Sequence, residues 1–209
     1  MKILVTGTAG FIGHSLAKVL LERGDTVIGV DNFNDYYEVS LKEDRNKELE
    51  KYSNFKLYRV DISKLNDLKE VFDENDIDRV CHLAAQAGVR YSIENPYVYA
   101  DSNMVGFVNM INLTKDKGIK HFIYASSSSV YGNTADIPFT EIQDVNSPIS
   151  LYAASKRSNE LIAYTYHHLF GLKTIGLRFF TVYGPWGRPD MAIFKFANQM
   201  SKRRGDSCI

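Results

Sequence analysis

Short apolar runs rich in β-branched residues alternate along the chain with longer segments of helical periodicity. The pattern predicts strands at Lys2–Val5, Thr26–Val30, Phe55–Val60, Arg79–Leu83, Phe122–Ala125 and Thr174–Arg178. Between them it predicts helices at Phe11–Glu22, Leu65–Asn75, Tyr97–Lys117 and Tyr152–Phe170. Because strands separated by crossover helices favour a parallel sheet covered on both faces, the expected fold class is α/β.

Two segments lie outside this alternation. The interval Tyr36–Tyr52 is rich in charge and is expected to form a solvated surface helix on an insertion. The last residues, Lys202 to Ile209, have no periodicity and are expected to form an irregular tail.

Composition then narrows the class of protein. The 209 residues are 44% hydrophobic, enough for one well-buried domain. Lys plus Arg equals Asp plus Glu at 25 each, so bulk charge predicts neither a nucleic-acid partner nor attraction to an anionic membrane. Cys81 and Cys208 lack a C-x-x-C spacing and the 5 histidines lack a ligand pattern, so no metal site is predicted. No apolar stretch could span a bilayer and no signal-peptide core is present, so the expected location is the cytoplasm.

A glycine-rich turn, Gly7-Thr8-Ala9-Gly10-Phe11-Ile12-Gly13, connects the first predicted strand to the first predicted helix. Glycines let the backbone approach a pyrophosphate closely, and the helix N-terminus offers free N–H groups to the phosphates. Asp31 closes the second strand, where a carboxylate can bind an adenosine ribose diol and would repel a 2′-phosphate. The predicted fold is therefore a Rossmann-type, doubly wound sheet, and the predicted cofactor is NAD. An ordinary glycine turn with Asp31 as a cap is the alternative.

Further cofactor contacts are expected at the ends of neighbouring strands. The predicted set from these segments is Gly7, Gly10, Phe11, Ile12, Gly13, Asp31, Asn32, Asp61, Ile62, Leu83, Ala84 and Ala85. Asp61 and Ile62 would flank the adenine, although Asp61 could equally cap a plain strand-to-helix turn. The small residues after Leu83 leave room for a cofactor, or pack closely for purely structural reasons.

Tyr152 and Lys156 lie four residues apart, on one face of a predicted helix. Tyrosine is a poor base because its ordinary pKa is about 10, and a nearby ammonium group lowers that pKa. Tyr152 could then remove a hydroxyl proton while hydride leaves the same carbon. Ser127, at the end of the preceding strand, is placed to hydrogen-bond that hydroxyl. A Tyr-x-x-x-Lys pair alone is usually an exposed helix face, but its position after a dinucleotide turn favours catalysis.

Several motifs together resemble the extended short-chain dehydrogenase family: Thr6–Gly13, His82–Ala85, Tyr124–Gly132 and Tyr152–Lys156. Within that family, Ala87–Ser92 and Arg178–Ala192 are similar to the UDP-glucuronate 4-epimerases. The resemblance runs from Met1 to about Phe196. It implies an isomerase that oxidises a nucleotide sugar at C4, lets the keto sugar turn, and reduces its other face. For UDP-glucuronate the product would be UDP-galacturonate, a step expected in polysaccharide biosynthesis.

The resemblance also implies roles for single residues. Ser127, Tyr152 and Lys156 would be catalytic, and Tyr152, Lys156 and Phe179 would also contact NAD. The implied substrate-binding set is Arg90, Ser127, Ser128, Tyr152, Thr181 and Arg188. Arg188 has the planar fork that suits a sugar carboxylate, although a surface ion pair with Asp190 is the alternative. Ser128 either donates to that carboxylate or caps the loop.

Other functions stay open. Nucleotide-sugar dehydratases and decarboxylases resemble the chain except that they carry an acidic residue within the segment that is Ser127-Ser128-Ser129 here. A second alternative is an NAD-binding but catalytically incomplete chain, because family members continue beyond the point where this resemblance is lost. The domain prediction is accordingly a Rossmann domain at 1–178 and, at 179–209, the start of a substrate lobe that is largely missing. A UDP-sugar is the expected partner, and the two longest predicted helices would suit a homodimer.

Overall fold

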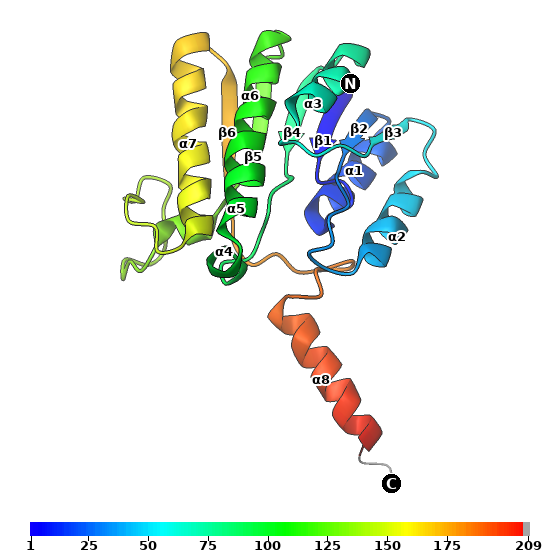
Figure 1. Ribbon diagram of the computed structural model, residues 1–209, viewed down its shortest axis with the longest axis vertical. Coiled ribbons are helices and arrows are strands. Elements are labelled where there is room, and N and C mark those ends of the chain that lie inside the picture. The colour runs from blue at the N-terminus through cyan, green and yellow to red at the C-terminus, as the bar shows by residue number, and fades with distance from the viewer. Residues whose placement is uncertain (207–209) are drawn as a thin grey trace.

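The computed structural model describes residues 1–206, which form a parallel sheet flanked by helices (Figure 1). The strands are β1 (Lys2–Thr6), β2 (Thr26–Val30), β3 (Phe55–Tyr58), β4 (Arg79–His82), β5 (His121–Ser127) and β6 (Lys173–Phe179). The six strands lie in the order β3-β2-β1-β4-β5-β6, and each neighbouring pair is parallel. The chain reverses its direction of travel across the sheet between β1 and β4, which confirms the predicted doubly wound fold.

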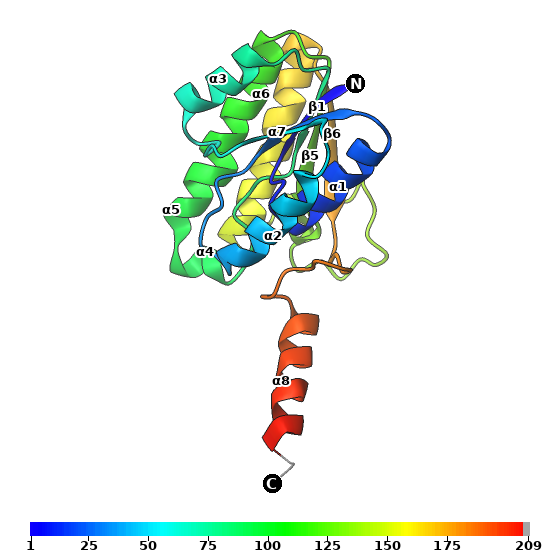
Figure 2. The ribbon, with the colours of Figure 1, turned by 90° about the vertical axis from the view of Figure 1, so that its right-hand side faces the viewer.

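The helices are α1 (Phe11–Glu22), α2 (Val39–Leu49), α3 (Leu65–Glu74), α4 (Tyr91–Glu94), α5 (Pro96–Tyr99), α6 (Gly106–Asp116), α7 (Leu151–Phe170) and α8 (Ala192–Asp206). A π-helical turn spans Ala100–Val105, and a 3₁₀ turn spans Ser128–Tyr131. In Figures 1 and 2, α8 projects away from the sheet and its other helices. The predicted domain boundary at 178/179 falls at the last residues of β6.

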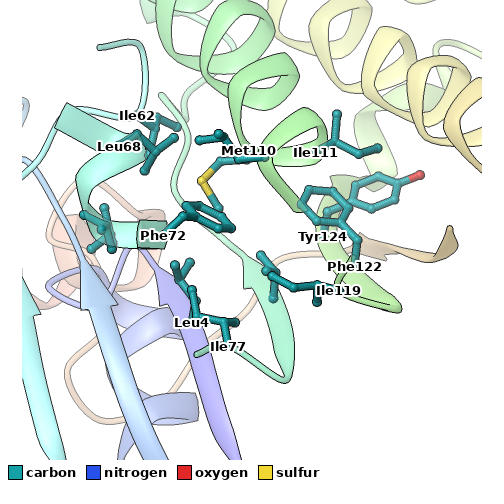
Figure 3. Packing of buried hydrophobic residues seen from close by; sticks show 14 of the residues in the cluster. Leu4, Ile62, Leu68, Phe72, Ile77, Met110, Ile111, Ile119, Phe122 and Tyr124 are labelled. Atoms are coloured by element: carbon teal, nitrogen blue, oxygen red, sulfur yellow. The ribbon is translucent and has the colours of Figure 1, made fainter. Parts of the chain in front are cut away.

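Alternation along β1 shows how the sheet buries both of its faces. Leu4 packs into the cluster formed with α3 and α6, where Figure 3 shows it near Phe72. Ile3 and Val5 point to the opposite face and pack with residues of α1 and α2. This period of two is expected of a strand covered on both sides. At the edge strand β6 the cover is incomplete, since Ile175 is 53% exposed.

The predicted helix Tyr97–Lys117 is not one regular helix, because the π-helical turn interrupts it after α5. The turn buries Asn103, whose Oδ1 accepts a hydrogen bond from the Gln86 backbone N–H at 2.8 Å. Asn103 Nδ2 also donates to the Gln86 carbonyl at 3.0 Å and to Ser155 Oγ at 3.1 Å. π-Helical turns are often found at functional sites. Here the turn fixes the backbone that follows β4.

Two other expectations about the segments were wrong. The charge-rich segment does form a helix, α2, but one of its faces is buried rather than solvated: Lys42, Arg45, Asn46 and Leu49. The C-terminal segment continues as helix α8 to Asp206 instead of becoming irregular at Lys202. Lysine and arginine are good helix formers, so the segment needed no apolar periodicity to remain helical. The rest of that prediction, 207–209, lies outside the described residues.

Candidate active site

A cavity of about 620 Å³ opens at the carboxyl ends of the parallel strands. In doubly wound sheets ligands bind at this edge, where the strand order reverses. Most of the predicted site residues line it: Gly7, Gly10, Phe11, Ile12, Gly13, Asp31, Asn32, Ile62, Leu83, Ala84, Ala85, Ser127, Ser128, Tyr152, Lys156, Phe179, Thr181 and Arg188. Asp61 and Arg90 do not line it. Residues predicted separately as a cofactor site and a catalytic site therefore share one cavity.

The glycine turn leaves no space for side chains at two of its positions. Gly7 has φ +78°, and its N–H donates to the Val30 carbonyl at 2.7 Å. A Cβ atom on Gly13 would lie only 2.0 Å from the Gly7 carbonyl oxygen. The N–H groups of Phe11, Ile12 and Gly13, at the start of α1, have no hydrogen-bond partner among the described residues. Such a cradle of free donors at a helix N-terminus fits a pyrophosphate.

Asp31 lies at the end of β2 and is almost completely buried, at 9% exposed. Its Oδ2 accepts from the Ala9 N–H at 3.0 Å and its Oδ1 from the Phe33 N–H at 2.8 Å. Burial raises the pKa of the Asp31 carboxyl, against the opposing effects of the Phe33 hydrogen bond and of Lys42. Asp31 therefore braces the glycine turn and also reaches the cavity wall, as a ribose-binding carboxylate must.

The structure does not bring Asp61 and Arg90 to the cavity. The Asp61 Oδ1 atom accepts from the Ser63 N–H at 2.8 Å and from Ser63 Oγ at 2.7 Å, and its Oδ2 accepts from Asn32 at 3.0 Å. These bonds correspond to the turn-capping alternative. Arg90 is exposed and lies immediately before α4. Contacts of Asp61 with adenine and of Arg90 with a sugar remain predictions.

The start of α7 sets the positions of Tyr152 and Lys156. Ser150 caps the helix, since its Oγ accepts a hydrogen bond from the Ala153 N–H at 3.0 Å. Tyr152 thus lies in the first turn and Lys156 in the second, both facing the cavity. Lys156 Nζ donates to the Ala125 carbonyl of β5 at 2.8 Å. Ser127 closes β5, and its Oγ accepts from Ser129 Oγ at 2.9 Å.

The predicted effect of Lys156 on Tyr152 differs from what the structure gives. Burial raises the pKa of the Tyr152 hydroxyl, and a hydrogen bond with Ser127 and the charge of Arg188 offset only part of that rise. The Lys156 ammonium is directed at a backbone carbonyl rather than at the phenol oxygen. Tyr152 is therefore a protonated phenol at neutral pH rather than a ready base.

Lys156→Met is expected to raise the free energy of unfolding by about 2 kcal/mol at neutral pH. This value is the gain from removing a buried charge, less the contribution of the hydrogen bond to Ala125 that is lost. Burial lowers the pKa of Lys156 from 10.5 to about 8. Below that value the folded chain holds a buried charge that the unfolded chain would solvate, so folding carries the full penalty. The penalty fades between about 8 and 10.5, where the folded chain loses its proton first, and is absent above this range.

Urea unfolding of both proteins at neutral pH and near pH 10 checks this expectation. The variant should be more stable at neutral pH, and the difference should shrink at the higher pH. Equal midpoints at neutral pH, or a difference that grows with pH, would show that Lys156 is not a buried cation with a lowered pKa. Lys47→Met is the control, because that side chain is 68% exposed and pairs with Asp44.

Arg188 forms the ion pair with Asp190 that was the alternative interpretation, and it also lies on the cavity wall, so its contact with a sugar carboxylate stays a prediction. It lines the cavity, and its Nε donates to Asp190 Oδ1 at 3.0 Å while its Nη2 contacts the other Asp190 oxygen. The Tyr36 hydroxyl donates to Asp190 Oδ2 at 3.3 Å. The ion pair thus holds the guanidinium at the cavity, where an anionic ligand would compete with Asp190.

Residues of the charge-rich segment also line the cavity, which the sequence did not predict. Tyr36, Tyr37 and Lys42 face it, and Lys42 Nζ donates to both oxygens of Asn34 at 2.6 Å. Gln86, fixed by Asn103, is a further lining residue that the sequence did not predict. A signal was present in the pair Tyr36-Tyr37, since adjacent aromatic side chains are unusual on a fully solvated insertion.

Residues 1–206 contain neither a membrane-spanning helix nor a cluster of metal-ligating side chains. No helix there is both long and apolar enough to cross a bilayer. No group of three or more histidine, cysteine, aspartate or glutamate side chains in the same part of the chain is arranged to hold a metal ion.

Comparison with known proteins gives a family and close relatives. Residues 3–209 match the model of the NAD dependent epimerase/dehydratase family. Protein CapI of Staphylococcus aureus is 59% identical over 196 residues, which cover 94% of this chain and 58% of that protein. A UDP-glucuronate 4-epimerase of Thermodesulfobacterium geofontis is 53% identical over 193 residues, covering 92% of this chain and 59% of that protein.

A solved structure is similar as well. UDP-glucuronic acid 4-epimerase from Bacillus cereus, in complex with UDP-glucuronic acid and NAD, aligns with a TM-score of 0.86 and 37% identity. The alignment covers 97% of this chain and 63% of that one, so the chain spans about three fifths of the length of these relatives. The predicted Rossmann-type fold and the predicted resemblance are both confirmed. The chain belongs to the NAD-dependent epimerase/dehydratase family.

Proposed function

We propose that the chain binds NAD and takes part in the C4 epimerisation of a UDP-sugar, with UDP-glucuronate as the substrate. The observation that carries the proposal is that Tyr152, Lys156 and Ser127 line the same cavity as the glycine turn and Arg188. One cavity therefore offers a pyrophosphate cradle, a proton donor and acceptor, and a cation for a carboxylate. The chain spans 58% to 63% of the length of the three relatives described above, so activity of the whole protein is part of this proposal.

The cofactor would lie along the cavity from Asp31 to Tyr152. The glycine turn would hold the pyrophosphate, and Asp31 would accept hydrogen bonds from the adenosine ribose. The relative from Bacillus cereus was solved with NAD, and its sequence is 37% identical. Bound NAD would supply the hydride acceptor for oxidation and the hydride donor for reduction.

The side chains of this chain would handle the proton and the orientation of the sugar. Tyr152 Oη would accept the C4 hydroxyl proton during oxidation and return it during reduction. Ser127 Oγ would hold the C4 oxygen in place by a hydrogen bond. Lys156, with its pKa lowered by burial to about 8, would supply positive charge near the site. Because burial raises the pKa of Tyr152, proton removal would depend on positive charge that arrives with the oxidised cofactor.

The sugar carboxylate is the reason for choosing UDP-glucuronate among UDP-sugars. Arg188 can form two parallel hydrogen bonds with a carboxylate, as it does with Asp190. Ser128 and Thr181 also line this region and offer hydroxyl donors. A neutral hexose would leave the guanidinium without a second anionic partner.

A specific observation argues against dehydration. Dehydration of a nucleotide sugar needs an acid and a base near C5 and C6. Among the described residues that line the cavity, Asp31 is the only carboxylate, and it lies at the glycine turn far along the chain from Tyr152. Epimerisation needs no such pair, because the same tyrosine serves both half-reactions.

The test is to incubate the chain with NAD⁺ and UDP-glucuronate and follow the sugar by proton NMR. Appearance of UDP-galacturonate supports the proposal, and a 4-keto-6-deoxy sugar or a decarboxylated pentose would replace it with another reaction. If the sugar is unchanged while NAD⁺ raises the unfolding temperature, the chain binds the cofactor without completing the reaction. Absence of both effects would overturn the cofactor assignment too.

Arg188→Leu is expected to raise KM for UDP-glucuronate at least tenfold, about the value of one lost charge-assisted pair. KM for UDP-glucose should change less than threefold, because that sugar has no carboxylate. Arg188→Lys should give an intermediate value, since lysine keeps the charge but not the fork. Steady-state kinetics with both sugars checks this, and equal losses for both would remove the carboxylate role.

The homodimer also stays a proposal. Val108 on α6 and Leu161 and Tyr164 on α7 are exposed by 40%, 53% and 69%, which gives these two helices apolar surface to bury. Closed twofold symmetry is the commonest arrangement of such surfaces.

A further inference from the structure

Arg45, in the middle of α2, is a completely buried arginine without an anionic partner. Its exposure is 0%. Its Nη1 donates to the Ala9 carbonyl at 2.9 Å and to the Tyr37 hydroxyl at 2.7 Å, and its Nη2 donates to the Trp186 carbonyl at 2.6 Å. All three acceptors are neutral, and Nε has no hydrogen-bond partner. Among the described residues no carboxylate forms an ion pair with it; nearby Glu48 contacts His14 instead.

A buried cation without an ion-pair partner is costly. The Asp31 carboxylate, which accepts from the Ala9 N–H, is an anion that Arg45 acts on electrostatically without contact. Because Asp31 forms no ion pair with Arg45, an anion bound at the glycine turn would further compensate the buried charge. Arg45 does not line the cavity, but its contact Ala9 belongs to the glycine turn that does. The guanidinium thus contacts the glycine turn without reaching the cavity itself. A dinucleotide pyrophosphate seated on that turn carries two negative charges.

The hydrogen bond to Ala9 also decides which groups of the turn face a ligand. A backbone carbonyl directed at a phosphate would repel it, whereas backbone N–H groups attract it. The Gly7 carbonyl is already used by the Gly10 N–H at 3.0 Å. The Ala9 carbonyl likewise accepts a hydrogen bond, from Arg45 Nη1. With both carbonyls engaged, the turn presents the free N–H groups of Phe11, Ile12 and Gly13.

We propose that Arg45 is a positioning residue for the dinucleotide pyrophosphate: it holds the Ala9 carbonyl away from the phosphates and supplies, through the turn, the charge that balances them. Through the Trp186 carbonyl it also ties the turn to the segment that carries Arg188. The inference rests on the NAD binding of the proposed function. Arg45 would act on the cofactor without contacting it, from a helix that the sequence predicted to be solvated.

The test compares NAD⁺ with adenosine, which lacks the pyrophosphate, by titration calorimetry or ligand-observed NMR. Arg45→Met should raise the Kd of NAD⁺ at least tenfold and change the Kd of adenosine less than twofold. Arg45→Lys, which keeps the charge, should restore most of the NAD⁺ affinity. Lys47→Met removes a charge from the exposed face of the same helix and should leave both values unchanged.

A second pair of variants keeps the test decisive if the methionine variant does not fold. Arg45→Gln and Arg45→Lys can both donate to Ala9, but only lysine carries charge. The Arg45→Lys variant should then bind NAD⁺ at least fivefold more tightly than the Arg45→Gln variant, and the two variants should bind adenosine equally. Equal NAD⁺ affinities, or parallel losses for NAD⁺ and adenosine, would overturn the role of Arg45 while leaving NAD binding intact. Failure of the unaltered chain to bind NAD⁺ would instead overturn the proposed function.

Discussion

Replacing Tyr152 with phenylalanine is expected to slow the interconversion of UDP-glucuronate and UDP-galacturonate about 1,000-fold. The change removes only the oxygen that would exchange a proton with the C4 hydroxyl. The ring should stay in place, because it packs in a T-shaped arrangement against Tyr99 with the ring centres 6.1 Å apart. NAD⁺ affinity should therefore change less than threefold, and the loss should appear in kcat.

Turnover is followed by proton NMR and NAD⁺ affinity by thermal shift on the same preparations. Tyr164→Phe is the matched control, since it removes a hydroxyl from the same helix at a side chain that is 69% exposed and outside the cavity. It should leave turnover unchanged. A Tyr152→Phe variant that keeps more than a tenth of the activity would show that another group moves the proton.

The parts of the site that were predictable depend on local sequence rules. The glycine turn follows from glycine spacing between a strand and a helix, and the structure places Gly7 and Gly13 where no Cβ atom fits. Tyr152 and Lys156 share a helix face because they are four residues apart. The parallel sheet covered on both faces could be predicted because helical segments separate its strands along the chain.

The functional face of α2 was not predictable from periodicity. Its buried positions Lys42, Arg45, Asn46 and Leu49 have helical spacing, but only Leu49 is apolar, so the usual amphipathic signal is absent. Lys42 and Asn46 donate within their own segment, to Asn34 and Glu50, whereas the buried Arg45 also donates to distant backbone carbonyls. Two of the three acceptors of Arg45, the Ala9 and Trp186 carbonyls, lie 36 and 141 positions away along the chain. No local pattern encodes such contacts.

The pKa values of Tyr152 and Lys156 could not be predicted from the sequence for a related reason. Sequence spacing places Lys156 near Tyr152, but it does not give the solvation of either group. In the structure Lys156 Nζ donates to the Ala125 carbonyl, and burial controls both pKa values. The interruption at Ala100–Val105 has the same origin, because Asn103 is drawn inward by Gln86 and Ser155 rather than by any feature of its own segment.

Gly13→Ala is expected to weaken NAD⁺ binding at least a hundredfold, about 2.7 kcal/mol. Alanine is a better helix former than glycine by about 1 kcal/mol, so at an open helical position the change would stabilise. Here the new Cβ atom would lie 2.0 Å from the Gly7 carbonyl oxygen and 2.6 Å from its carbonyl carbon. Both are backbone atoms, so the turn itself must move, and overpacking of this kind costs about 1–3 kcal/mol of stability.

The same displacement explains why the affinity for NAD⁺ should fall as well as the stability. Moving Gly7 shifts a turn whose position is fixed by its hydrogen bond to Val30 and by contact with Ala84. The free N–H groups of α1 then no longer converge on one point, and a pyrophosphate needs several of them at once. Calorimetry with NAD⁺ and thermal unfolding without it separate the two effects. Val19→Ala on the same helix, at a side chain 60% exposed, should leave NAD⁺ affinity unchanged. Unchanged affinity in Gly13→Ala would mean that the pyrophosphate does not bind at this turn.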